Sequence, residues 1–282
     1  MTGWLFPGQP LRCEQFTDHN HDLDQLHQLC CEVTGYDLLK GQPCSDGTLS
    51  NHTALQIHGV VSSLYRSRCL KKSGETPDLL AEHSLGIYAA LAVAGCISEQ
   101  VALELVARIG NSMSKLAGSR EYALGCPIGL PVGLVEAAAR NNGVYVANYN
   151  TSRHFLLAGV KQNIETALAE CQAAGAFSVS SFACEAPLHT PLMAEISSDL
   201  AAIVADYRFV EPQIPLIESL AQTSLSAAAI PAFLVDELQQ PVYWERTWKF
   251  VRAAGVTRCT EVGSGQALTK FNRWIDSEAG AL

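Results

Sequence analysis

The sequence predicts an α/β protein in which a smaller unit is inserted into a larger one. Clusters of Gly, Pro and polar residues cut the chain into short apolar segments that alternate with helical patterns. Between about residues 118 and 180 the pattern changes to short strands that flank two alanine-rich helices. The order predicted there is β-α-β-β-α-β, which is typical of a compact split unit. The expected division is 1–116 for the first part of the larger unit, 117–181 for the smaller unit and 182–282 for the rest.

Strands and helices are expected to alternate along both parts of the larger unit. Ser98 is the expected N-cap of one helix, because its hydroxyl can accept a hydrogen bond from a free N–H of the first turn. The expected elements are a strand that ends at Phe6, helices at 21–34 and 51–68, a strand at 78–81, helices at 87–94 and from Ser98 to Leu116, strands at 215–218 and 258–262, and a helix from 267.

The smaller unit is expected to contain strands at 143–148, 155–159 and 177–180 and helices at 130–141 and 161–174. Gly175 is expected to end the second helix, because glycine readily adopts the left-handed conformation found at helix C-termini.

The composition argues against several classes of partner. With 48% hydrophobic and 17% charged residues among 282, the chain can bury a substantial core. Its net charge of −9 argues against nucleic acid or an anionic membrane surface as the main partner. The longest apolar run, Ala89 to Cys96, is too short to span a bilayer, and the N-terminus has no basic segment ahead of an apolar core.

The ten cysteines are scattered along the chain and include no Cys-x-x-Cys pair. A zinc site is therefore not expected, and no metal ligands are assigned. Several cysteines lie in apolar stretches, where a free thiol behaves as a small hydrophobic group. This usage is typical of a reducing compartment, so the expected location is the cytoplasm.

The most informative motif is Glu82-His83-Ser84-Leu85-Gly86, which lies between a buried-type strand and a run of helix formers. A strand, a sharp turn and a helix form the context in which a serine becomes a nucleophile at the edge of an α/β sheet. The turn exposes the hydroxyl and directs backbone N–H groups to the place where negative charge develops. The serine also needs a base within hydrogen-bond reach, and the chain has eight histidines. The alternative interpretation of Ser84 is a helix N-cap.

Five motifs follow one another along nearly the whole chain, at Phe6–Gln9, His83–Leu91, Val146–Asn150, His189–Met193 and Glu261–Thr269. In this order they resemble the motifs of malonyl-CoA:acyl carrier protein transacylases and polyketide acyltransferase domains. The resemblance implies an α/β-hydrolase-like large subdomain with an inserted ferredoxin-like small subdomain. It also implies an active site in the cleft between the two.

The resemblance further implies roles for individual residues. Ser84 would be the nucleophile, and His189 the general base and then the general acid. The backbone N–H groups of Gln9 and Leu85 would form the oxyanion hole. A backbone carbonyl near Glu237 would orient the histidine in place of a carboxylate. The expected substrate-binding residues are Ile109, His154, Asn150 and His83.

One departure from the family pattern concerns the acyl group. Ile109 stands 25 residues after Ser84, where the family has an arginine that holds the free carboxylate of malonyl groups in a bidentate clamp. Arg108 is adjacent, but one helical residue corresponds to a rotation of about 100°. Arg108 is therefore expected on a solvated face, in an i,i+4 pair with Glu104.

Three more departures surround the cleft. Glu82 replaces the first glycine of the Gly-x-Ser-x-Gly motif, Ile87 replaces the glutamate that follows it, and His154 replaces a glutamine in the strand that borders the cleft. The Glu82 carboxylate is expected to reach solvent or a backbone donor, and a functional role is the alternative.

The expected function is transfer of an acyl group between a coenzyme A or carrier-protein thioester and a phosphopantetheine thiol, through an acyl-Ser84 intermediate. The acyl group is expected to lack a free carboxylate, because a carboxylate against Ile109 would be desolvated without a partner. The expected partners are an acyl carrier protein and acyl-CoA, with no nucleic acid, no membrane and no permanently bound cofactor. Two alternatives stay open: a hydrolase that clears acyl groups from carrier proteins with the same Ser–His pair, and a non-catalytic carrier-docking subunit.

Overall fold

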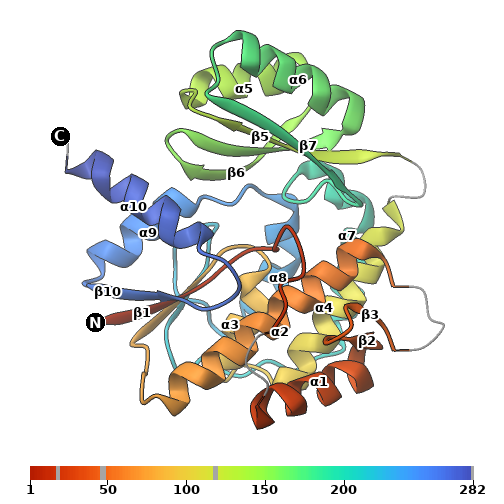
Figure 1. Ribbon diagram of the computed structural model, residues 1–282, viewed down its shortest axis with the longest axis vertical. Helices are drawn as coiled ribbons and strands as arrows, with labels where there is room; N and C mark the ends of the chain where they lie inside the picture. The colour runs from red at the N-terminus through yellow and green to blue at the C-terminus, as the bar shows by residue number, and fades with distance from the viewer. Residues whose placement is uncertain (17–19, 45–48, 117–119, 281–282) are drawn as a thin grey trace.

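The computed structural model describes residues 1–16, 20–44, 49–116 and 120–280. A larger body is built on a parallel sheet and a smaller body on an antiparallel sheet (Figure 1). The strand order of the parallel sheet is β10-β1-β4-β9, and its strands are β1 (Thr2–Phe6), β4 (Leu79–Glu82), β9 (Leu216–Ile217) and β10 (Arg258–Glu261). Because the strands are parallel, their carboxyl ends meet at one edge of the sheet. The turns that follow Phe6 and Glu82 are therefore neighbours, since these two residues are paired in register.

Helices cover the parallel sheet on both faces. Alternate side chains of the strands enter two different cores: Trp4, Phe6 and Leu80 lie in one, and Leu5 and Ala81 in the other. Both faces of the strands are thus apolar, as expected of a parallel sheet between helical layers. The helices of the first core are α1 (His21–Thr34), α2 (Asn51–Lys72), α3 (Gly86–Val93), α4 (Glu99–Ser114), α7 (Ser197–Ala205) and α8 (Ile230–Asp236), and those of the second are α9 (Trp244–Ala253) and α10 (Ala267–Ala279).

Three short elements complete the larger body. A small hairpin joins β2 (Tyr36–Asp37) to β3 (Gln42–Pro43), and the 3-10 helices η2 (Pro191–Ile196) and η3 (Glu237–Gln239) precede α7 and follow α8.

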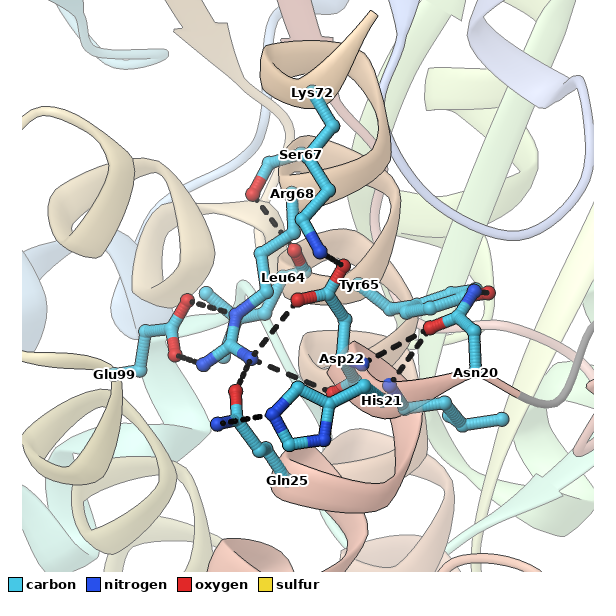
Figure 2. A network of polar contacts seen from close by, with 11 residues as sticks. Asn20, His21, Asp22, Gln25, Leu64, Tyr65, Ser67, Arg68, Lys72 and Glu99 are labelled. Carbon is cyan, nitrogen blue, oxygen red and sulfur yellow. Dashed lines mark hydrogen bonds and ion pairs between the residues drawn. The ribbon is translucent and has the colours of Figure 1, made fainter.

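A polar network fastens α1, α2 and α4 to one another (Figure 2). Arg68 of α2 donates through Nε to Glu99 Oε1 at 3.1 Å and through Nη1 to Gln25 Oε1 at 3.2 Å. Lys72 lies 2.5 Å from Asp22 Oδ2. Helix α2 thus runs past the expected end at residue 68, because its last turn carries lysines that favour a helix C-terminus and one of them pairs with α1.

The smaller body has the β-α-β-β-α-β order that the sequence predicts. Its antiparallel sheet has the order β6-β7-β5-β8, and α5 and α6 cover the face that is turned away from the larger body (Figure 1). Its elements are β5 (Tyr122–Ile128), α5 (Val132–Asn141), β6 (Tyr145–Thr151), β7 (His154–Val160), α6 (Lys161–Ala173) and β8 (Ser178–Cys184).

The expected boundaries of the smaller unit, 116/117 and 181/182, stay predictions. Residues 117–119 lie outside the described residues, and β8 continues to Cys184. Within the described residues, no helix combines the length and the apolar character needed to cross a membrane.

Candidate active site

Ser84 lies on a sharp turn between β4 and α3 and has a φ of 54°. This left-handed conformation is rare for a residue with a side chain, because Cβ crowds the backbone. Gly86 allows the turn to sit against β1, since a Cβ at this position would lie 2.3 Å from the Phe6 carbonyl oxygen. A strained serine between a strand and a helix is the geometry of a nucleophile elbow.

His189 contacts the Ser84 hydroxyl directly. The distance from Ser84 Oγ to His189 Nε2 is 2.6 Å, and His189 Nδ1 lies 2.7 Å from the Glu237 backbone oxygen. A carbonyl oxygen can only accept, so Nδ1 carries the proton and the bare Nε2 faces the serine. Burial of the ring lowers the pKa of His189 to about 4, and the imidazole is therefore neutral at physiological pH. The expected carbonyl at Glu237 is thus present in the structure.

The two N–H groups expected in the oxyanion hole lie on adjacent turns. Gln9 follows β1, and Leu85 directly follows Ser84. A Cβ on Gly8 would approach His83 Nδ1 to 2.8 Å, so the turn after β1 lies against the turn that carries the serine. Within the described residues, neither backbone N–H donates to another protein group. Both donors are therefore available, and their role stays a prediction.

Three of the expected substrate-binding residues form a hydrogen-bonded chain. His83 Nε2 lies 3.0 Å from Asn150 Oδ1, and Asn150 Nδ2 lies 3.1 Å from His154 Nδ1. His83 also packs beside Trp244, with ring centroids 5.7 Å apart. These hydrogen bonds join the turn beside Ser84 to β6 and β7 of the smaller body. Both ends of the Asn150 amide have protein partners, and contact of these residues with a substrate stays a prediction.

Ile109 lies on α4 in the main apolar core and is 1% exposed. Arg108 projects from the other side of the helix, as expected, but its partner was wrongly assigned. It donates to Asp206 Oδ2 at 2.7 Å and to the Tyr207 hydroxyl at 3.1 Å, whereas Glu104 accepts from Gln100. Packing of α7 against α4 brings this aspartate within reach, which the spacing along one helix does not reveal.

A polar cluster beside Gln9 was not predicted. Gln9 Nε2 lies 3.5 Å from His52 Nδ1, and Gln56 Nε2 lies 3.2 Å from His52 Nε2. The backbone N–H of His52 donates to Glu185 Oε1 at 3.3 Å. His52 and Gln56 are neighbours on α2, but Gln9 and Glu185 come from other parts of the chain and share no motif with them, so only the fold brings the cluster together. No group of three or more His, Cys, Asp or Glu side chains in the described residues could hold a metal ion.

An α/β sheet with a hydrogen-bonded Ser–His pair on a strand-to-helix turn is the arrangement of serine-dependent acyl-transfer enzymes. The chain matches the acyl transferase domain family over residues 35–263, and it belongs to this family. It is thus an acyltransferase, and the predicted combination of an α/β-hydrolase-like and a ferredoxin-like subdomain is confirmed.

Relatives and solved structures agree with this assignment. The malonyl CoA-acyl carrier protein transacylase of Salmonella typhimurium is 33% identical over 210 residues, which cover 73% of this chain and 68% of that protein. An acyl carrier protein S-malonyltransferase from Vibrio cholerae has a TM-score of 0.86 and 28% identity, covering 98% of this chain and 94% of its own. A malonyl-transacylase in complex with its holo type II polyketide acyl-carrier protein has a TM-score of 0.87 and 28% identity, covering 98% and 93%.

Proposed function

We propose that this protein transfers an acyl group between a coenzyme A or carrier-protein thioester and a phosphopantetheine thiol, through an ester on Ser84. The observation that carries the proposal is the 2.6 Å contact between Ser84 Oγ and the unprotonated Nε2 of a neutral His189. A partner of the acyl carrier protein class is supported by the similar transacylases, one of which is bound to its carrier protein.

The first half-reaction forms the acyl-enzyme. His189 Nε2 accepts the Ser84 proton as Oγ attacks the thioester carbonyl carbon, and the free N–H groups of Gln9 and Leu85 stabilise the oxyanion. The C–S bond then breaks, and the imidazolium returns the proton to the departing thiolate. The Glu237 carbonyl keeps the ring oriented and accepts a hydrogen bond from Nδ1–H throughout.

The second half-reaction runs in the reverse sense with a new thiol. The acceptor thiol gives its proton to His189, its sulfur attacks the ester, and Ser84 recovers the proton as the acyl group leaves. Ser84 and His189 supply the nucleophile and every proton transfer, so we propose no permanently bound cofactor. We also propose a cytoplasmic setting, which is supported by ten cysteines that are all free thiols.

The acyl group is proposed to lack a free carboxylate. Ile109 is apolar, Arg108 pairs with Asp206 on the far side of α4, and His154 is held by Asn150. A malonyl carboxylate would then be desolvated without a cationic partner, which is unfavourable.

The test is incubation with a panel of acyl thioesters, followed by intact mass and peptide mapping. We expect an acyl adduct on Ser84 that a carrier-protein thiol removes. An adduct that decays equally fast without any acceptor thiol would indicate the hydrolase instead. Absence of an adduct with all thioesters would contradict the proposal.

A further inference from the structure

Three carboxyl side chains are buried beneath the turn that carries Ser84. Glu82 ends β4 and is 0% exposed, Glu237 lies in η3 at 1%, and Glu218 follows β9 at 4%. The parallel strands β4 and β9 end at the same edge, which places Glu82 beside the loop that contains Glu218. No Lys, Arg or His of the described residues forms an ion pair with any of the three, and together they make no metal-binding group.

Hydrogen-bond donors are distributed unequally among these carboxyl groups. Glu218 accepts hydrogen bonds from the backbone N–H groups of Leu220, Ala221 and Thr223 and from the Thr223 hydroxyl. Both of its carboxylate oxygens therefore have hydrogen-bond donors. Glu82 Oε1 accepts from the backbone N–H of Ser219 at 2.7 Å, and the Ser219 hydroxyl and the Ser84 N–H also face this carboxyl group. Within the described residues, Oε2 of Glu82 and Oε2 of Glu237 are buried without a hydrogen-bond partner.

This distribution favours a neutral form of Glu82 and Glu237. A buried carboxylate needs several donors or a cation, whereas a protonated carboxyl group is tolerated with fewer. Burial raises the pKa of Glu82 to about 8 and holds the pKa of Glu237 well above its usual range. The neighbouring charge of Glu218 raises both pKa values further.

The two residues that carry these carboxyl groups adjoin the two members of the Ser–His pair. Glu82 precedes Ser84 by two positions, and its carboxyl group faces the Ser84 backbone N–H. Glu237 supplies the carbonyl that holds His189 Nδ1. Tyr88 of α3 is a further titratable group near Glu237, and burial and the Glu237 carboxyl group both raise its pKa.

We propose that Glu82, as a neutral carboxylic acid, is a positioning residue that fixes the Ser84 turn against the β9 loop and keeps Glu237 and His189 in place. Its ionisation would add a negative charge beside Glu218 and Glu237 without a partner, and would move the turn and the carbonyl that orients His189. The inference rests on the proposed function, because its main readout is acylation of Ser84. Activity is expected below the Glu82 pKa and lost as the pH rises through it.

The test is the pH profile of Ser84 acylation by a thioester that the protein accepts, corrected for spontaneous thioester hydrolysis. In the unchanged protein the rate should fall at alkaline pH, with a midpoint near the Glu82 pKa of about 8. Glu82→Gln, which mimics the neutral acid, should keep the rate at neutral pH within a few-fold and remove the alkaline fall. Glu82→Ala should lose more than tenfold at neutral pH. The exposed Glu75→Gln is the control and should leave the profile unchanged.

The results separate this inference from the proposed function. If Ser84 is acylated but the fall in rate at alkaline pH persists in Glu82→Gln, the positioning role of Glu82 is overturned and the proposed acyltransferase function still stands. No acylation at any pH would overturn the function itself. An independent measurement needs no variant: the infrared C=O stretch of a protonated carboxyl group should be visible at neutral pH in ¹³C-glutamate-labelled protein and should weaken at alkaline pH. Its absence at neutral pH would refute the neutral acid.

Discussion

Ser84 and His189 meet with Oγ 2.6 Å from Nε2, and both residues adopt the left-handed backbone conformation, with φ of 54° and 59°. Residues other than glycine rarely adopt this conformation, and each such residue costs on the order of 1–3 kcal/mol of folding free energy. Because two such residues are in direct contact, we infer that the backbone strain is tolerated because it orients the Ser84 hydroxyl toward the imidazole. The strain is sustained by rigid neighbours, since Gly86 packs on β1 and the His189 N–H donates to the Leu238 carbonyl at 2.8 Å.

Ser84→Ala is expected to abolish acyl-enzyme formation and to leave the fold intact. The substitution removes only the hydroxyl, and no other group reaches the same position on the turn. Intact mass after incubation with an accepted thioester gives the result, and circular dichroism checks the fold. An adduct of equal yield on another residue would show that Ser84 is not the nucleophile.

His189→Ala is expected to slow acylation by about 10²–10⁴-fold, the usual contribution of general acid–base catalysis. In the unchanged protein the rate should rise with pH through the His189 pKa of about 4, because only the neutral imidazole can accept the serine proton. Rapid-quench acylation over a pH series measures both effects. His83→Gln is the comparison variant. A larger loss of acylation rate in His83→Gln than in His189→Ala would show that His83, and not His189, is the general base.

Much of the site could be predicted because it depends on local sequence. The turn at Ser84 needs a strand, a small residue at Gly86 and a helix, and these follow one another in the chain. The helix at 21–34 has the bounds of α1, and the helix from 267 begins as α10 does. In these segments the apolar period agrees with the tertiary structure.

What could not be predicted depends on contacts between distant segments. Strand β5 contains Gly125 and Pro127, which weaken a strand signal, yet a Cβ on Gly125 would lie 3.0 Å from Ile164 of α6. The glycine is therefore explained by packing. Arg108 pairs with Asp206 only because α7 packs on α4, and Glu82 and Glu237 influence each other electrostatically only because the fold brings them near.

Asn150→Ala is expected to destabilise the protein by about 1–3 kcal/mol, because it leaves ring nitrogens of the buried His83 and the half-buried His154 without their partner. Urea unfolding measures the free energy. Asn141→Ala, at an exposed amide that donates to Glu170, is the control and should change stability by less than about 0.5 kcal/mol. Equally small changes in the free energy of unfolding in the two variants would show that the His83–Asn150–His154 hydrogen bonds do not stabilise the turn that carries Ser84.

Ile109→Arg is expected to shift the acyl preference toward malonyl. The unchanged protein should load an uncharged acyl group such as acetyl onto Ser84 far better than malonyl, because Ile109 is apolar and Arg108 pairs with Asp206. An arginine at this position would supply a charge-assisted partner worth about 1.5–3 kcal/mol, which corresponds to roughly a tenfold or larger change in the ratio of the two adducts. The ratio is measured by intact mass in one mixture of both thioesters, so a partial loss of folded protein affects both adducts equally.

Ile109→Met is the matched control, since it keeps the position apolar at a similar volume and should leave the ratio unchanged. Longer acyl groups should load less well in Ile109→Arg, because the predicted substrate-binding role of Ile109 would place the guanidinium beside the acyl group. Efficient malonyl loading by the unchanged protein would contradict the proposed acyl specificity. It would mean that Arg108 leaves Asp206, or that His154 leaves Asn150, to bind the malonyl carboxylate.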